Sequence, residues 1–249
     1  MTANGVYVYA IIHADRALPD DVGGVGGPPV AVRTVGHGAL AAVVSEAPAQ
    51  LRARRRDLLA HQDLLLRLTD EGPVLPMRFG MVAPDEETVK AQLNRAEAAH
   101  LATLQQLAGR VEVNLKALPA QDALAALVAE DKNVRRLREE VRRRPTYDAS
   151  VRLGEAVATA LSRRAAEAGK KALRTLTPLA RSVSAGPEVQ GCTLNVSFLV
   201  DRSDSDSFRA TALALADQYR EHAELRLAGP LPCYSFVGSE SVPATAAGV

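Results

Sequence analysis

One histidine and one arginine stand near a pair of carboxylates in the first third of the chain. His61 lies on the apolar face of a leucine-rich segment, and Arg78 follows shortly before Asp85 and Glu86. A histidine, an arginine and a carboxylate brought together could transfer protons. No serine or cysteine nucleophile falls in a recognisable motif nearby. The sequence therefore favours a histidine satisfied by hydrogen bonds at the core edge and an arginine paired with a carboxylate.

The segment that carries Arg78, residues 73–82, is apolar apart from that guanidinium. Its two prolines disfavour a helix, and the alternation after them predicts a strand with Met77, Phe79 and Met81 on one face. Burying an unpaired charge is costly, so the arginine is predicted to be paired inside the fold or held at an interface. Arg78 and Phe79 are the first candidates for contact with a partner.

Two other features suggest ligand sites and are better explained without one. The glycine-rich stretch Gly23–Gly27 has Pro29 where a dinucleotide motif needs its third glycine, and it leads into a strand rather than a helix. The five histidines and the two cysteines, Cys192 and Cys233, show no metal-ligand spacing. We expect no cofactor, no metal and two free thiols.

The run from Arg135 to Arg144 contains six arginines, interrupted by Glu139 and Glu140. It lacks the interleaved aromatic residues of a nucleic-acid surface, and the whole chain carries a net charge of only +1. The pattern favours a solvated helix face, with a protein partner as the second interpretation. Arg135 and Arg138 are the candidate contacts, and neither nucleic acid nor a membrane is expected as a partner.

The composition indicates a globular protein. With 249 residues, of which 47% are hydrophobic, the chain can form one large or two small domains. The apolar run from Val6 to Ile12 is too short to span a membrane and lacks the basic flank of a signal peptide. We therefore expect a cytoplasmic protein.

The first half of the chain predicts an N-terminal α+β domain over residues 1–109. Strands are expected at 6–12, 30–35 and 39–45, the last two joined by a hairpin at 36–38. A helix over 51–70 presents a stripe that includes Leu58, His61 and Leu65. A second helix, from 84 to 108, ends at Gly109.

The second half predicts a ferredoxin-like α/β sandwich over residues 110–238. Strands at 110–118, 176–184, 193–201 and 225–228 alternate with helices at 119–144, 147–169 and from 203. The order strand, helix, strand, strand, helix, strand is that of a split βαβ fold, with one extra long helix inserted. The fold class is thus α+β with two domains, and residues 239–249 form a disordered tail.

Eight short segments, taken in order, carry a family resemblance. They are Val6–Ile11, Gly38–Ser45, Ala60-His61, Pro73–Gly80, Gly109–Glu112, Arg152–Glu155, Phe198–Asp201 and Gly229–Phe236. Together they resemble the gas vesicle protein F/L family (GvpF/GvpL). The tail of that family usually reads Gly-Pro-x-Pro-Pro-Tyr-x-Phe, and here Cys233 replaces the second of the paired prolines.

The resemblance implies a non-enzymatic role in building gas vesicles, which are hollow protein organelles. It implies a two-domain accessory protein, in the cytoplasm or on the gas vesicle, that binds the hydrophobic shell protein and other accessory proteins. A shell subunit with an apolar surface must be kept from aggregating before assembly, and a soluble partner could cover that surface.

Two alternatives remain open. The first is a small-molecule-binding regulatory protein, because ferredoxin-like sandwiches often bind metabolites. The second is an enzyme centred on His61 and Arg78. A dry pocket that held both with a carboxylate would favour the enzyme, whereas a fully packed His61 would argue against it.

Overall fold

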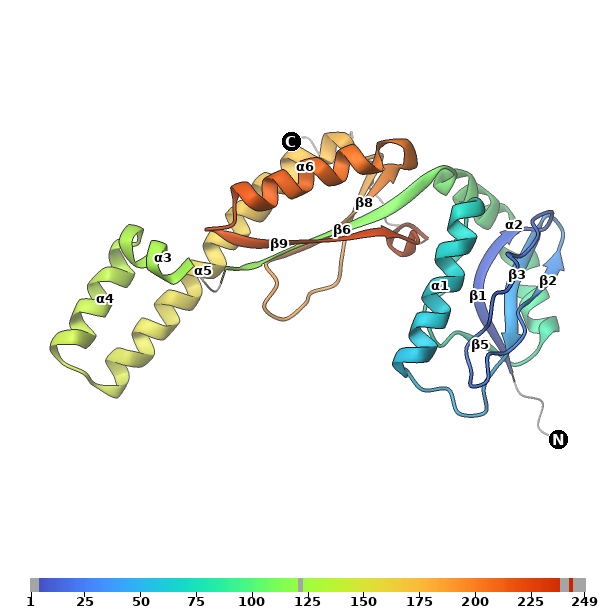
Figure 1. The fold of residues 1–249 in the computed structure, drawn as a ribbon, viewed down its shortest axis with the longest axis horizontal. Helices are drawn as coiled ribbons and strands as arrows, with labels where there is room; N and C mark the ends of the chain where they lie inside the picture. Colours follow the sequence, from blue (N-terminus) through green and yellow to red (C-terminus); the bar gives the residue numbers. More distant parts are fainter. Residues whose placement is uncertain (1–4, 121–122, 238–241, 244–249) are drawn as a thin grey trace. The chain divides into compact units, whose positions relative to one another are not determined.

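The computed structural model describes residues 5–120, 123–237 and 242–243. The chain folds into two five-stranded sheets with helices packed against each (Figure 1). Its contacts divide it into two compact units. The first unit runs to Glu112 and includes the returning segment from Pro230, and the second extends from Val113 to Gly229. The predicted α+β class is confirmed, while the predicted domain boundary at residue 109 stays a prediction.

The sheet of the first unit is antiparallel, with the strand order β2-β3-β1-β4, and β5 also pairs with β1. The strands are β1 (Val6–His13), β2 (Arg33–His37), β3 (Leu40–Glu46), β4 (Leu75–Pro76) and β5 (Val82–Ala83). The predicted hairpin is confirmed. It turns at Gly38, whose positive φ of 57° suits glycine.

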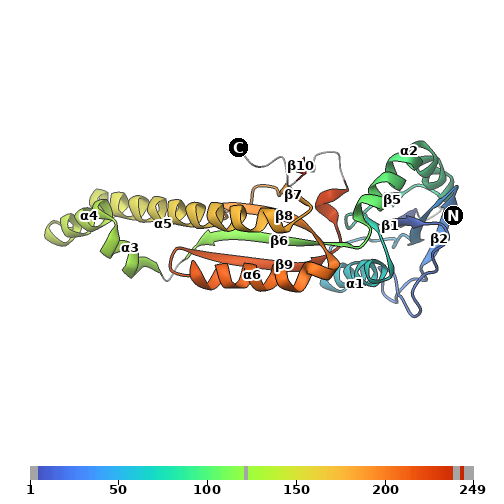
Figure 2. The ribbon, with the colours of Figure 1, turned by 90° about the horizontal axis from the view of Figure 1, so that it is seen from above.

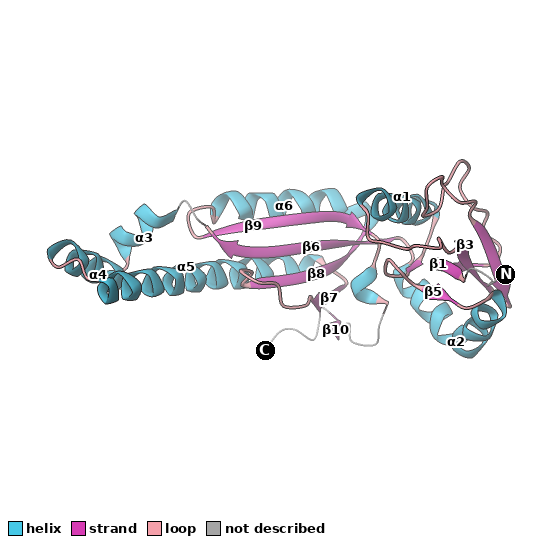
Figure 3. Ribbon diagram, turned by 90° about the horizontal axis from the view of Figure 1, so that it is seen from below, coloured by secondary structure: helices cyan, strands magenta, loops and turns pink. Residues whose placement is uncertain are grey.

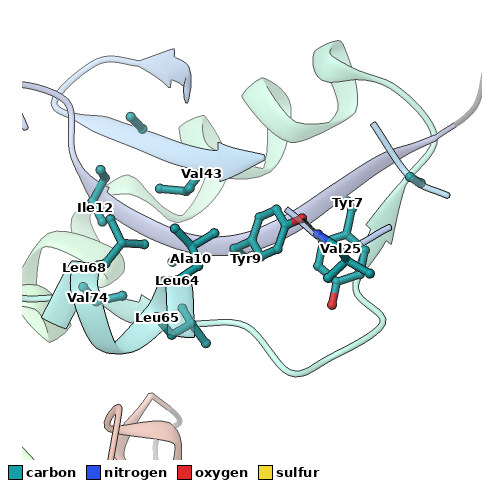
Figure 4. Packing of buried hydrophobic residues seen from close by; sticks show 12 residues of the cluster. Tyr7, Tyr9, Ala10, Ile12, Val25, Val43, Leu64, Leu65, Leu68 and Val74 are labelled. Carbon is teal, nitrogen blue, oxygen red and sulfur yellow. Dashed lines mark hydrogen bonds between the residues drawn. The ribbon is translucent and has the colours of Figure 1, made fainter. Parts of the chain in front are cut away.

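Two helices cover the opposite faces of this sheet. Helix α1 (Arg55–Glu71) buries His61, Leu64, Leu65 and Leu68 against the face that carries Tyr7, Tyr9 and Ile12; Figure 4 shows the core between them. The predicted leucine stripe was wrong at Leu58, which is 41% exposed. Its neighbour Asp57 faces inward instead, because the buried face is centred between positions 61 and 68.

Helix α2 (Glu86–Leu107) packs on the other face of the sheet. The Asp85 carboxylate accepts a hydrogen bond from the Thr88 backbone N–H (2.7 Å) and so caps the helix. The helix buries Val89 and Leu93. Beyond its end Gly109, with φ of 67°, turns the chain into the next strand, as predicted.

The second sheet has the strand order β10-β7-β8-β6-β9. Its long helices α5 and α6 lie on one face, as two views show (Figures 2 and 3). The order along the chain is that of the predicted ferredoxin-like sandwich. The strands are β6 (Arg110–Pro119), β7 (Ser182–Ala185), β8 (Leu194–Asp201), β9 (Ala223–Leu231) and β10 (Val242–Pro243). The α-helices are α3 (Leu124–Glu130), α4 (Lys132–Arg143), α5 (Tyr147–Leu176) and α6 (Ser205–Gln218).

Two helix predictions and one strand prediction in this half were wrong. The single helix expected over 119–144 is two helices, because the Asp131 side chain accepts hydrogen bonds from the N–H groups of Asn133 and Val134 and starts α4 anew. Helix α5 does not end at Gly169 but continues to Leu176. The end of α5 and the 3₁₀ helix Thr177–Leu179 replace the first part of the strand expected over 176–184, so β7 begins only at Ser182.

Gly169 instead permits close packing. A Cβ at this position would lie 3.0 Å from the Cβ of Ala117 on β6, so the absent side chain lets α5 approach the sheet. Most of the tail predicted as disordered, 239–249, lies outside the described residues. The two described residues of this tail, Val242 and Pro243, form a short strand that pairs with β7, so they are not disordered as predicted.

Candidate protein-binding site

The segment between β4 and β5, residues 77–81, is not the predicted strand. Its ends are tied to β1 by hydrogen bonds from Met77 N to Tyr9 O (2.8 Å) and from Val8 N to Met81 O (2.9 Å). Between them the chain turns at Gly80, whose φ is 92°. This turn breaks the alternation, so Phe79 packs against the core while Met81 is 50% exposed.

A buried hydrogen-bond network holds this turn in place. His61 Nε2 lies 3.0 Å from the Met77 carbonyl, which can only accept, so this nitrogen carries the proton. His61 Nδ1 then accepts from the Tyr7 hydroxyl at 3.0 Å, and the hydroxyl oxygen accepts from the Gly80 N–H at 3.0 Å. The geometry thus assigns a neutral imidazole that links α1 and β1 to the turn.

Burial controls the ionisation of the same groups. His61 is 3% exposed, and burial lowers its pKa, while burial raises the pKa of Tyr7. The rings of Tyr7, His61 and Phe79 also pack edge to face, with 5.7 Å between the centroids of His61 and Phe79. His61 is therefore fully packed, which supports the structural interpretation and argues against an enzyme centred on it.

The neighbouring Tyr9 anchors the glycine-rich stretch. Its hydroxyl lies 2.9 Å from Ser45 Oγ. It also accepts from the Val25 N–H at 2.7 Å (Figure 4). Val25 is fully buried, and Gly24 N donates to Val30 O. The stretch is thus a packed loop, as predicted.

Arg78 was expected to pair with a carboxylate, and this expectation was wrong. Its side chain is exposed, and within the described ranges it makes no hydrogen bond or ion pair. Arg16, by contrast, is largely buried, with 13% of its side chain exposed, and it donates to the carbonyls of Leu68 (2.7 Å) and Pro73 (2.9 Å). Burial lowers the pKa of this guanidinium.

An apolar pocket of about 280 Å³ opens beside the 77–81 turn, between β1 and α2. Met81 and Val82 line it and are 50% and 45% exposed. The other apolar lining residues are Val8, Ile11, Ala42, Met77, Ala83, Pro84, Val89 and Leu93. Gln92 and His100 add the only polar side chains of the lining, and burial lowers the pKa of His100. The pocket suits one or two apolar side chains of a partner.

The arginine-rich helix lies in the second unit. There α3 and α4 pack beside the first half of α5 around Leu127, Val134 and Ala160 (Figure 1). Arg135 and Arg138 are both exposed, as expected for a solvated face. Their role in partner contact stays a prediction. They belong to a different unit from Arg78 and Phe79, so the described structure does not assign the four residues to one site.

A second pocket, of about 460 Å³, lies between the end of α5 and the start of α6. Arg181 lines it and donates to Asp201 through Nε (2.7 Å), so its charge is already neutralised. Across the described residues, no cluster of three or more His, Cys, Asp or Glu side chains could hold a metal ion. No described helix is long and apolar enough to span a membrane.

Comparison with known proteins agrees with this architecture. The crystal structure of the gas vesicle protein GvpF from Anabaena sp. PCC7120 superimposes with a TM-score of 0.74 at 24% identity, covering 95% of this chain and 99% of that one. The GvpF structure from Microcystis aeruginosa gives a TM-score of 0.70 at 19% identity, covering 95% and 100%. The two-sheet α+β fold is thus the fold of these gas vesicle proteins.

The sequence comparisons define the family. Residues 5–238 match the family model described as gas vesicle synthesis protein GvpL/GvpF. Gas vesicle protein F from Streptomyces sp. (strain CB03234) is 42% identical over 93% of this chain and 98% of its own length. Gas vesicle protein L from the same strain is 31% identical over 93% of this chain and 92% of its own length. The chain belongs to the GvpL/GvpF family, and its role is related to gas vesicles.

Proposed function

We propose that this protein is a gas vesicle assembly factor or minor vesicle component that works in the cytoplasm and on the vesicle by binding. Its partners are the hydrophobic shell protein and other accessory proteins. Family membership supports the vesicle role. The observation that carries the binding role is the apolar pocket between β1 and α2, with Met81 half exposed at its rim.

The chemistry of the pocket fits such a partner. Its lining is almost entirely aliphatic or thioether, and methionine side chains adapt to apolar surfaces of varied shape. An exposed apolar segment of a subunit awaiting assembly gains free energy when it leaves water, and covering it prevents its aggregation. The hydrogen-bonded turn holds Met77 and Met81 at the pocket without needing the partner.

Co-purification and vesicle counts test the proposal. The Met81→Lys variant places a charge at the pocket rim and should reduce recovery of the shell protein at least tenfold, with fewer vesicles in electron micrographs of complemented cells. Leu179→Lys, at a residue 47% exposed in the second unit, is the matched control and should behave like wild type. Normal vesicle number and shape after gene deletion, together with no co-purification, would refute the proposal.

The alternative of a small-molecule-binding regulator makes a different prediction. Calorimetry of the full chain with nucleotides and amino acids would then show saturable binding. The pocket between α5 and α6 offers such anionic ligands little, because its Arg181 is already bound to Asp201. We expect no heat of binding from these ligands.

A further inference from the structure

The outer edge of β9 is the longest open strand edge of the second sheet. The strand spans nine residues and ends the sheet order, so in the described part of the chain no strand pairs with its outer side (Figure 3). An open edge presents unpaired backbone N–H and C=O groups to solvent. Such an edge can accept one further antiparallel strand.

Apolar side chains accompany this edge. Leu225 and Leu227 point toward the core but are only partly buried. On α6, Leu213 is 51% exposed and lies one helical turn beyond Arg209. The Arg209 guanidinium donates to the Gly229 carbonyl of β9 (2.8 Å), so this flank of the helix faces β9. Leu213 therefore stands beside the open edge.

Leu213 and Leu225 also stand at nearly the same height along the edge. The chain reverses between them at residues 219–222. Strands rise about 3.3 Å per residue and helices about 1.5 Å, which places each leucine roughly 10 Å from the reversal. A partner strand that contacts Leu225 at the edge would therefore also contact Leu213.

We propose that β9 is a dimer seam at which a second copy of this chain pairs antiparallel about a two-fold axis at Leu225. In this register Glu224 lies opposite Arg226 of the second copy, and Arg226 lies opposite its Glu224. Ala223 and Leu227 face each other in the same way, and Leu225 meets its own counterpart. The two copies of Leu213 cover the seam on the helix side.

The charges select this register. Glu224 and Arg226 share one face of the strand and already contact each other, with 2.7 Å between Arg226 Nε and Glu224 Oε1. Pairing about Leu225 completes a square of alternating charges. An axis at Glu224 or at Arg226 would instead bring like charges directly opposite, which destabilises a strand pair. The edge is therefore complementary to itself in one register.

Sedimentation velocity of the full chain over a range of concentrations tests the seam. Wild type should form a dimer. Glu224→Arg and Arg226→Glu should each weaken dimerisation at least tenfold, because each puts like charges opposite one another. An equimolar mixture of the two variants should form the heterodimer, in which every pair is again opposite in sign. This recovery also shows that both variants are folded.

Two further variants separate the seam from a general effect of charge. Leu213→Lys should weaken the dimer at least tenfold. Val151→Lys, at a residue of α5 that is 41% exposed, should leave it unchanged. A wild-type chain that stays monomeric throughout, single charge variants that dimerise like wild type, or a mixture that fails to restore the dimer would each overturn the proposal.

Discussion

The placement of two arginines shows how differently one residue type serves this fold. Arg16 comes from a loop distant in sequence, yet its guanidinium satisfies the carbonyls of Leu68 and Pro73 at the end of α1. No local pattern reveals this role, because the partners are backbone atoms more than fifty residues away. Arg78 attracts attention through its apolar neighbours but lies on the outside of a turn.

This contrast predicts unequal costs for the same substitution. Arg16→Gln should lower the free energy of unfolding by about 1–3 kcal/mol, because it leaves partly buried carbonyls without a charged donor. Arg78→Gln should change it by no more than about 0.5 kcal/mol, as at an ordinary surface position. Urea denaturation followed by circular dichroism measures both, and equal losses would contradict the assignment.

His61 is the residue whose environment the sequence anticipated best, as a histidine on an apolar helix face. Its neutral form accepts from Tyr7 and donates to the Met77 carbonyl. Proton uptake would turn Nδ1 into a donor, so the Tyr7 hydroxyl would lose the acceptor for its own hydrogen. The partner atoms themselves could not be predicted, since they depend on the turn at residues 77–81.

The pH dependence of stability follows from this environment. Because burial lowers the pKa of His61 in the folded state, the unfolded chain binds its proton first as pH falls below about 6.5. The free energy of unfolding should therefore fall from pH 7.5 to pH 5.5, and level off only once folded His61 is protonated. His61→Gln should show a smaller fall over the same range.

His100 provides the control for this measurement. Burial lowers its pKa too, so it contributes with the same sign. The test compares how steeply the free energy of unfolding changes with pH in wild type and in His61→Gln. The same comparison is made in a His100→Gln background. Parallel slopes for all of these proteins would show that His61 is not the titrating group.

At the scale of elements, hydrophobic periodicity predicted most of the fold. It failed where a single glycine conformation or a single hydrogen-bonding side chain determines the local structure. Strands β1, β3, β6 and β8 are runs rich in apolar residues, and tertiary packing agrees with their local preference. The 77–81 turn and the break at Asp131 depend on one glycine conformation and one capping side chain. Both occur inside patterns that continue on either side, so the sequence pattern conceals them.

The break at Asp131 predicts a specific cost for its removal. Asp131→Ala deletes the acceptor for the N–H groups of Asn133 and Val134 and should lower the free energy of unfolding by about 1 kcal/mol. Asp131→Asn keeps an acceptor oxygen while removing the charge that faces Arg163, so it should retain most of the stability. Equal losses in the two variants would assign the effect to the ion pair instead of the cap.

At the scale of the whole molecule, apolar burial is distributed unevenly. Among the described residues, the main core of the second unit holds eleven buried residues, including Leu115 and Phe198, beneath α5 and α6. A separate described cluster, where α3 and α4 pack on the first half of α5, holds three: Leu127 on α3, Val134 on α4 and Ala160 on α5. We call this part of the unit the α3–α4 arm. Regions with few buried contacts open at lower free energy than the main core. The arm should therefore be the first part of the second unit to open.

Hydrogen exchange with mass spectrometry tests this order of opening. Leu127→Ala leaves a cavity in the small cluster, which costs about 2–5 kcal/mol for a fully buried leucine, and should speed exchange in α3, α4 and the first half of α5. Exchange in β6 and β8 should stay as in wild type, because the main core is intact. Leu115→Ala is the matched variant in that core and should speed exchange in β6 and β8 as well. Equal acceleration of β8 by both variants would show that the arm and the main core open as one cooperative body.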